Sequence, residues 1–128
     1  YRTVDLEAKA ASASPYELVL VLFDGLIDEL ARARGHIENK RFEQKGVSLE
    51  KCMNILNGLS SALDYEQGGE VVQGIARLYD YFVHRLSDVS VTLSLEGLDE
   101  VENLVRTLRE GWEGVNAARR EAGGGLGA

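Results

Sequence analysis

The sequence predicts an all-α protein: an antiparallel up-down four-helix bundle with a flexible N-terminal arm and a Gly-rich C-terminal tail. The 128 residues contain a single proline. Apolar residues recur at steps of three and four along four segments, which is the helical period. The connections between these segments are short, so consecutive helices must lie antiparallel. We therefore expect one domain, with an arm at 1–13, the bundle at 14–118 and a tail at 119–128.

The first helix is predicted over residues 15–38. Ser14-Pro15-Tyr16-Glu17 forms a capping box with proline at the first helical position, where its missing N–H is not needed. The predicted core stripe of this helix is Val19, Leu22, Phe23, Leu26, Leu30, Ala33 and Ile37.

The second helix follows a turn at Asn39-Lys40 and ends near Leu63. After it, the stretch 65–69 ends in Gly68-Gly69, and paired glycines free the backbone for a sharp reversal. The predicted core stripe of the second helix is Phe42, Leu49, Cys52, Met53, Leu56, Leu59 and Leu63.

The third and fourth helices complete the bundle. The fourth has acidic residues at its start and Arg119 and Arg120 at its end, as the helix dipole favours. The third helix places Val71, Ile75, Leu78, Tyr79, Phe82, Leu86, Val89 and Leu93 on its core stripe, and the fourth places Leu98, Val101, Val105, Leu108, Trp112 and Val115 there.

Composition and charge indicate which class of partner the chain binds. Hydrophobic residues make up 45% of the chain and charged residues 27%, which is typical of a folded domain. The net charge of −7 disfavours nucleic acid and anionic membrane surfaces, because both require clustered Lys and Arg. The longest apolar run, 18–23, is too short to span a membrane, and residues 1–5 lack the apolar core of a signal peptide. A lone Cys52 fits the reducing cytoplasm, so we expect a cytoplasmic protein that binds other proteins.

No pattern in the chain predicts an enzyme, a cofactor or a metal site. His36 and His84 are isolated, and no Glu-x-x-His motif of the di-iron bundles occurs. A phosphotransfer or signalling bundle that uses His84 is the alternative function. His84 is followed by a leucine at Leu86, but Asp88, one turn later, would repel a phosphoryl group.

Apolar residues beyond the core stripes indicate a groove for a partner's amphipathic helix. Glycines inside the predicted helices add to this interpretation, because they let another backbone approach closely. The same residues also fit a wide core stripe in a marginally stable domain, and the two interpretations are equally consistent with the residues alone. The surplus comprises Leu18, Leu20, Val21, Ile27, Val47, Ile55, Ala62 and Leu104, with Gly58 among the helical glycines.

Six short motifs, in order along residues 13–115, resemble the flagellar secretion chaperone family FliS, the export chaperones for flagellin. Each motif is weak alone, but together they are specific. They are Ala13-Ser14-Pro15, Leu20-Val21-Leu22-Phe23-Asp24-Gly25, Ile37-Glu38-Asn39-Lys40, Gly68-Gly69-Glu70, Leu78-Tyr79-Asp80-Tyr81 and Gly111-Trp112.

The resemblance implies a function that composition does not. Members of this family bind the C-terminal region of flagellin in the cytoplasm, prevent its premature polymerisation and deliver it to the flagellar type III export apparatus. Tyr1 matches a tyrosine of the family's N-terminal arm that can cover the client groove, although a disordered end residue fits equally well. The tract Glu7 to Ser12 is longer than in many members, and the sequence leaves self-association open. The predicted client-binding residues are Tyr1, Leu18, Val21, Val47, Ile55, Gly58, Ala62 and Leu104.

Overall fold

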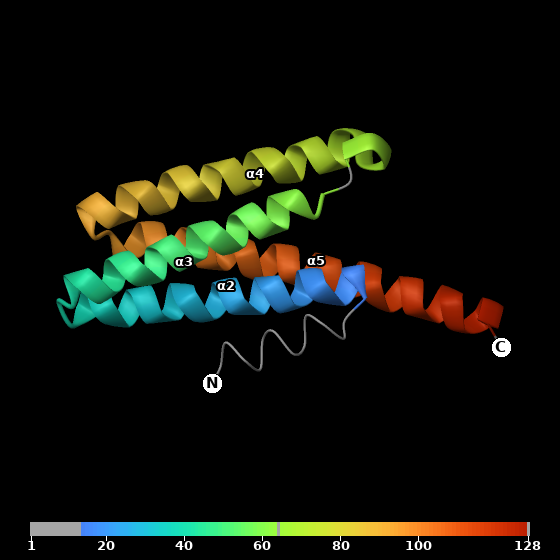
Figure 1. Ribbon diagram of the computed structural model, residues 1–128, viewed down its shortest axis with the longest axis horizontal. Coiled ribbons are helices and arrows are strands. Elements are labelled where there is room, and N and C mark those ends of the chain that lie inside the picture. Colours follow the sequence, from blue (N-terminus) through green and yellow to red (C-terminus); the bar gives the residue numbers. More distant parts are fainter. Residues whose placement is uncertain (1–13, 64, 128) are drawn as a thin grey trace.

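The protein is a bundle of four helices in a computed structural model that describes residues 14–63 and 65–127 (Figure 1). They are α2 (Pro15–Glu38), α3 (Phe42–Ser61), α4 (Tyr65–Thr92) and α5 (Leu95–Gly127). The described ranges contain no strand, which confirms the predicted all-α class. The predicted arm at 1–13 lies outside the described residues.

The helices form a closed ring in which each contacts two neighbours. α2 packs against α3 and α5, and α4 packs against the same two helices. The interface between α2 and α3 is the most extensive of the four. Because the helices alternate in direction along the ring, the arrangement is the predicted up-down bundle (Figure 1).

The hydrophobic core draws on all four helices. Phe23 of α2, Leu56 of α3, Phe82 of α4 and Val101 of α5 are each at most 2% exposed. These positions belong to the stripes that the three- and four-residue periodicity predicts.

The start of α2 is built as the sequence predicts. The hydroxyl of Ser14 accepts a hydrogen bond from the backbone N–H of Glu17 at 3.2 Å, and Pro15 occupies the first helical turn. At the other end, the side chain of Asn39 donates to the carbonyl of Gly35 at 2.7 Å, and Lys40 has a φ of 59°. Asn39-Lys40 is thus the turn between α2 and α3.

The predicted break at 65–69 is narrower than expected. Residues 65–68 already belong to α4, and the departure from helical geometry lies at Gly69, with φ 56° and ψ −134°. A Cβ at Gly68 would overlap the side chain of Val72, so the first glycine is required as well. The paired glycines therefore produce a kink inside a helix instead of a loop before it.

Three residues assigned to core stripes are exposed, and these assignments were wrong. Phe42 is 49% exposed, Val71 72% and Val115 51%. Phe42 is the first residue of α3, Val71 follows the kink in α4, and Val115 comes three residues after Trp112, which contacts Tyr16 in the first turn of α2. A helical period identifies a face but does not show where along the helix the neighbouring helices end.

The last helix extends further than the predicted boundary at 118. α5 continues to Gly127 and reaches beyond the other helices at the end of the bundle where α2 begins (Figure 1). The flexibility of 119–128 stays a prediction. None of the helices described is both long and apolar enough to cross a membrane.

Candidate client-binding strip

The seam between α2 and α3 brings together apolar residues from both helices. A Cβ built at Gly58 of α3 would lie 3.8 Å from Cδ1 of Leu22 on α2, an ordinary van der Waals distance. Leu22 and Ile55 are partly buried and pack against the core. Gly58 therefore faces α2, and its lack of a side chain leaves Leu22 accessible along this seam.

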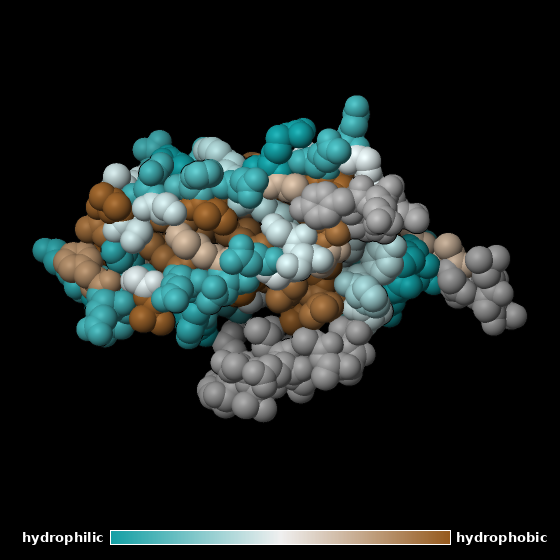
Figure 2. All heavy atoms as spheres, turned by 45° about the horizontal axis from the view of Figure 1, so that its top comes forward, coloured by the Kyte–Doolittle hydropathy of each residue, from teal (hydrophilic) through white to brown (hydrophobic). Residues whose placement is uncertain are grey.

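Five of the predicted client-binding residues lie at or beside this seam, as judged by their spacing from Leu22 and Gly58 along the two helices. Leu18 and Val21 are half-buried and lie within about one turn of Leu22 on α2. Ile55 and Ala62 lie three and four residues from Gly58 on α3. Figure 2 shows apolar atoms at the surface over the end of the bundle where α2 begins and α3 ends. We call this set the α2–α3 strip: Leu18, Val21, Leu22, Ile55, Gly58 and Ala62.

The structure places the other three predicted residues elsewhere. Val47 is 50% exposed and lies roughly 16 Å along α3 from Gly58, at 1.5 Å per residue. Leu104 of α5 packs against the core, one turn after Glu100, which contacts α4. Tyr1 is outside the described residues.

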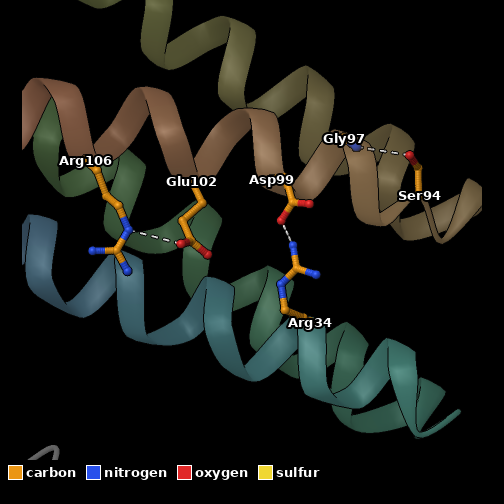
Figure 3. Close-up of polar contacts among 6 residues, drawn as sticks. All are labelled: Arg34, Ser94, Gly97, Asp99, Glu102 and Arg106. Atoms are coloured by element: carbon orange, nitrogen blue, oxygen red, sulfur yellow. Dashed lines mark hydrogen bonds and ion pairs between the residues drawn. The ribbon is translucent and has the colours of Figure 1, made fainter.

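Two ion pairs connect α5 to α2. Asp99 of α5 pairs with Arg34 of α2, and Arg109 Nε lies 2.6 Å from Asp24 Oδ1. Figure 3 shows Arg34 and Asp99 pointing toward each other across the α2–α5 seam. In the ring of helices, the α2–α3 seam is opposite the α4–α5 seam. The strip therefore lies away from the helix that carries these ion pairs.

Glu100 is the centre of the polar cluster between α4 and α5. Its Oε1 accepts hydrogen bonds from the hydroxyl of Tyr81 at 2.6 Å and from Nε of Arg85 at 2.9 Å. Both bonds lower the pKa of Glu100, the Tyr81 bond most, and the same bond raises the pKa of Tyr81. Glu100 and Arg85 therefore stay charged at neutral pH, and the cluster links α4 to α5 at the surface of the bundle.

Gly97 is a close-packing residue that the sequence analysis did not single out. It is buried in the first turn of α5, where its N–H donates to the hydroxyl of Ser94 at 3.0 Å (Figure 3). A Cβ at Gly97 would lie 3.0 Å from Cγ2 of Val89 and 3.2 Å from Cζ of Arg85. The absence of a side chain therefore lets α5 approach α4 closely.

The residues considered for chemistry are not assembled into a site. His84 is exposed on α4, as are Asp80 and Asp88. Among the described residues, no three His, Cys, Asp or Glu side chains gather in a group that could hold a metal ion. Cys52 is completely buried, and its pKa is raised to about 12 by burial and, to a lesser extent, by the charge of Glu29.

The buried thiol leads to a first testable prediction. Because the thiolate is the reactive form, we expect Cys52 to react with a disulfide reagent at pH 8 at least about tenfold more slowly in the folded protein than in urea.

The raised pKa of Cys52 also means that the folded state retains the thiol proton to a higher pH than the unfolded state. Its contribution to stability is therefore present below pH 9 and is lost as the pH rises toward 12. Equal reaction rates in the two states would contradict the burial of Cys52.

Comparison with known proteins shows which family the sequence matches. The family model described as "Flagellar protein FliS" matches residues 1–119. The flagellar secretion chaperone FliS of Salmonella typhimurium is 38% identical over 117 residues, which cover 91% of this chain and 87% of that protein. The flagellar secretion chaperone FliSB of Pseudomonas aeruginosa is 36% identical over 116 residues, 91% of this chain and 92% of that protein. A third relative, FliS of Bacillus subtilis, is 30% identical over 114 residues, 88% of this chain and 84% of that protein.

Proposed function

The chain belongs to the FliS family of flagellar proteins, and on this premise we propose that it is a cytoplasmic export chaperone for flagellin. In this proposal it binds the C-terminal helical segment of flagellin, prevents premature polymerisation and delivers the subunit to the flagellar type III export apparatus. The matched relatives are flagellar secretion chaperones, and a chaperone family is not an enzyme family. The unpaired Cys52 supports a reducing cytoplasmic location.

The α2–α3 strip is the observation that carries the proposal. An amphipathic helix binds by placing apolar residues, one turn apart, into a groove of aliphatic side chains. Leu18 and Leu22 on α2 and Ile55 on α3 supply such side chains, and Gly58 leaves room for a client backbone beside Leu22. Covering the apolar face of a flagellin segment in this way would remove the surface through which subunits associate.

The phosphotransfer alternative has less support. His84 is exposed, but Asp88 is exposed one turn later on the same helix, where its charge would oppose an incoming phosphoryl group. The matched relatives are chaperones, which favours the first of the two functions.

The test is calorimetric binding to monomeric flagellin encoded in the same genome. We expect binding with a heat-capacity change on the order of −0.2 to −0.5 kcal/mol/K, because a coupled folding interface buries mostly apolar surface. A flagellin that lacks its C-terminal segment is the control and is expected not to bind. Equal binding by the truncated flagellin, or a heat-capacity change near zero, would contradict the proposal.

Delivery and location are tested in cells. Deleting the gene should reduce secreted flagellin while flagellin synthesis continues, and the protein should fractionate with the cytoplasm. Flagellin export that is unaffected by the deletion would refute the export role.

A further inference from the structure

The end of α5 is attached to the start of α2 by a stack of three side chains. The rings of Tyr16 and Trp112 are stacked, with centroids 5.4 Å apart and planes 17° from parallel. The indole Nε1 of Trp112 donates a hydrogen bond to the backbone carbonyl of Tyr16 at 2.8 Å. The guanidinium carbon of Arg119 lies 4.6 Å from the centroid of the Tyr16 ring, within the range of a cation–π contact. We call Tyr16, Trp112 and Arg119 the Tyr16 stack.

The stack is the principal attachment of α5 beyond residue 111. Asn116 is 5% exposed and accepts a hydrogen bond from Nη2 of Arg119 at 3.4 Å, a contact within α5 that holds Arg119 beside the stack. In contrast, residues 113–115 and 117–122 are exposed. Gly111 and Gly114 have open space where a Cβ would lie, so neither gains packing that offsets the low helix propensity of glycine. A helical segment of this kind is marginal without tertiary contacts.

The stack and the α2–α3 strip use opposite faces of the same first turn of α2. Tyr16 is in the first turn of α2, two residues before Leu18. This turn is held by the Ser14 cap and by the hydrogen bond from Trp112. A client that contacts Leu18 needs this turn to be ordered, and the end of α5 needs the same turn as its anchor. Client binding and the anchoring of the end of α5 therefore both depend on the same ordered first turn of α2.

We propose that the Tyr16 stack couples occupation of the α2–α3 strip to the folding of residues 113–122. This inference rests on the proposed flagellin binding. Coupling between sites is reciprocal, so client binding stabilises the end of α5 by the factor by which the folded end of α5 strengthens client binding. Trp112 is in this scheme a positioning residue that acts on the client through Tyr16.

Hydrogen exchange on the full chain, with and without the C-terminal segment of flagellin, tests the coupling. We expect the amides of 113–122 to exchange at least about fivefold more slowly when the segment is bound. Client binding with no change in these amides would overturn the inference and leave the proposed function intact. No binding by the unmodified protein would instead refute the proposed function itself.

Variants distinguish coupling from direct contact. Trp112→Ala should weaken binding by about fivefold or more, and residues 113–122 should stay unprotected even when the variant is saturated with client. Protection of these residues in saturated Trp112→Ala would show direct contact with the client and overturn the inference. Val115→Ala is the matched control, because Val115 is exposed in the same segment outside the stack, and it should bind normally.

Milder variants keep the test valid if Trp112→Ala does not fold. Trp112→Phe retains a ring over Tyr16 and loses the indole N–H, and Arg119→Gln removes the cation at an exposed position, where we expect the fold to be kept. Both should exchange faster at 113–122 than the unmodified protein without client. Unchanged exchange in both variants would overturn the inference.

Discussion

Replacing Ile55 with aspartate is expected to weaken flagellin binding by at least about 2 kcal/mol, roughly thirtyfold in Kd. Ile55 is half-buried in the α2–α3 strip, and a client covering the strip would exclude water from the new carboxylate. An unpaired charge in such a contact has no partner to offset its lost hydration. The affinity is measured by calorimetry, with circular dichroism to confirm that the variant is folded.

The matched control for this variant is Val47→Asp on the same helix. Val47 is 50% exposed and outside the strip, so we expect normal binding and a stability within about 0.5 kcal/mol of the unmodified protein. Gly58→Leu is a second probe, because a Cβ there meets Leu22 at an ordinary distance and the longer chain would fill the strip. We expect it to fold and to lose client binding.

Ile55→Asp is also expected to lower the stability of the free protein, because Ile55 packs against the core. If Ile55→Asp unfolds the protein while Gly58→Leu binds flagellin normally, the strip is ordinary core. The client would then have to bind elsewhere on the bundle.

A large loss of stability from one added side chain is expected at Gly97, where α5 packs closely on α4. Gly97→Val should lower the free energy of unfolding by about 1–3 kcal/mol, the usual range for overpacking a well-packed site. A Cβ there would lie 3.0 Å from Val89, which is fully buried and has no room to move. It would also displace Arg85 and disturb its ion pair with Glu100.

Urea unfolding of Gly97→Val measures this loss, with Gly111→Val as the matched control. Gly111 is helical and exposed, with nothing within 4 Å of a Cβ position, so valine there should change stability by no more than about 0.5 kcal/mol. If the two variants were equally stable, the close approach of α4 and α5 at Gly97 would be refuted.

Features that depend on neighbouring residues in the chain were predictable. The Ser14 cap, the turn at Asn39-Lys40 and the core stripes follow from local chemistry and from the helical period. The exposure of Phe42 did not follow, because it depends on where the neighbouring helices end. Sequence periodicity contains no information about that position.

The α2–α3 strip was predictable only in part, for a similar reason. The surplus of apolar residues marked Leu18, Val21 and Ile55, but spacing along one helix cannot show which neighbour its second face meets. Gly58 faces Leu22 because of how α2 and α3 pack, and Leu104 lies on a different seam because α5 packs against α4. The end of α5 was not predicted because the helix continues to Gly127 through a glycine-rich sequence of low helix propensity.

The ring of helix contacts also bears on the order in which the chain can assemble during synthesis. α2 and α3 are adjacent in the chain and share the most extensive interface, so their pairing requires only the first half of the protein to have left the ribosome. The interface between α2 and α5 joins the first described helix to the last and must wait for nearly the whole chain. The apolar residues of the strip lie on the pair of helices that is synthesised first, and the ion pairs of α5 are the contacts that close the ring.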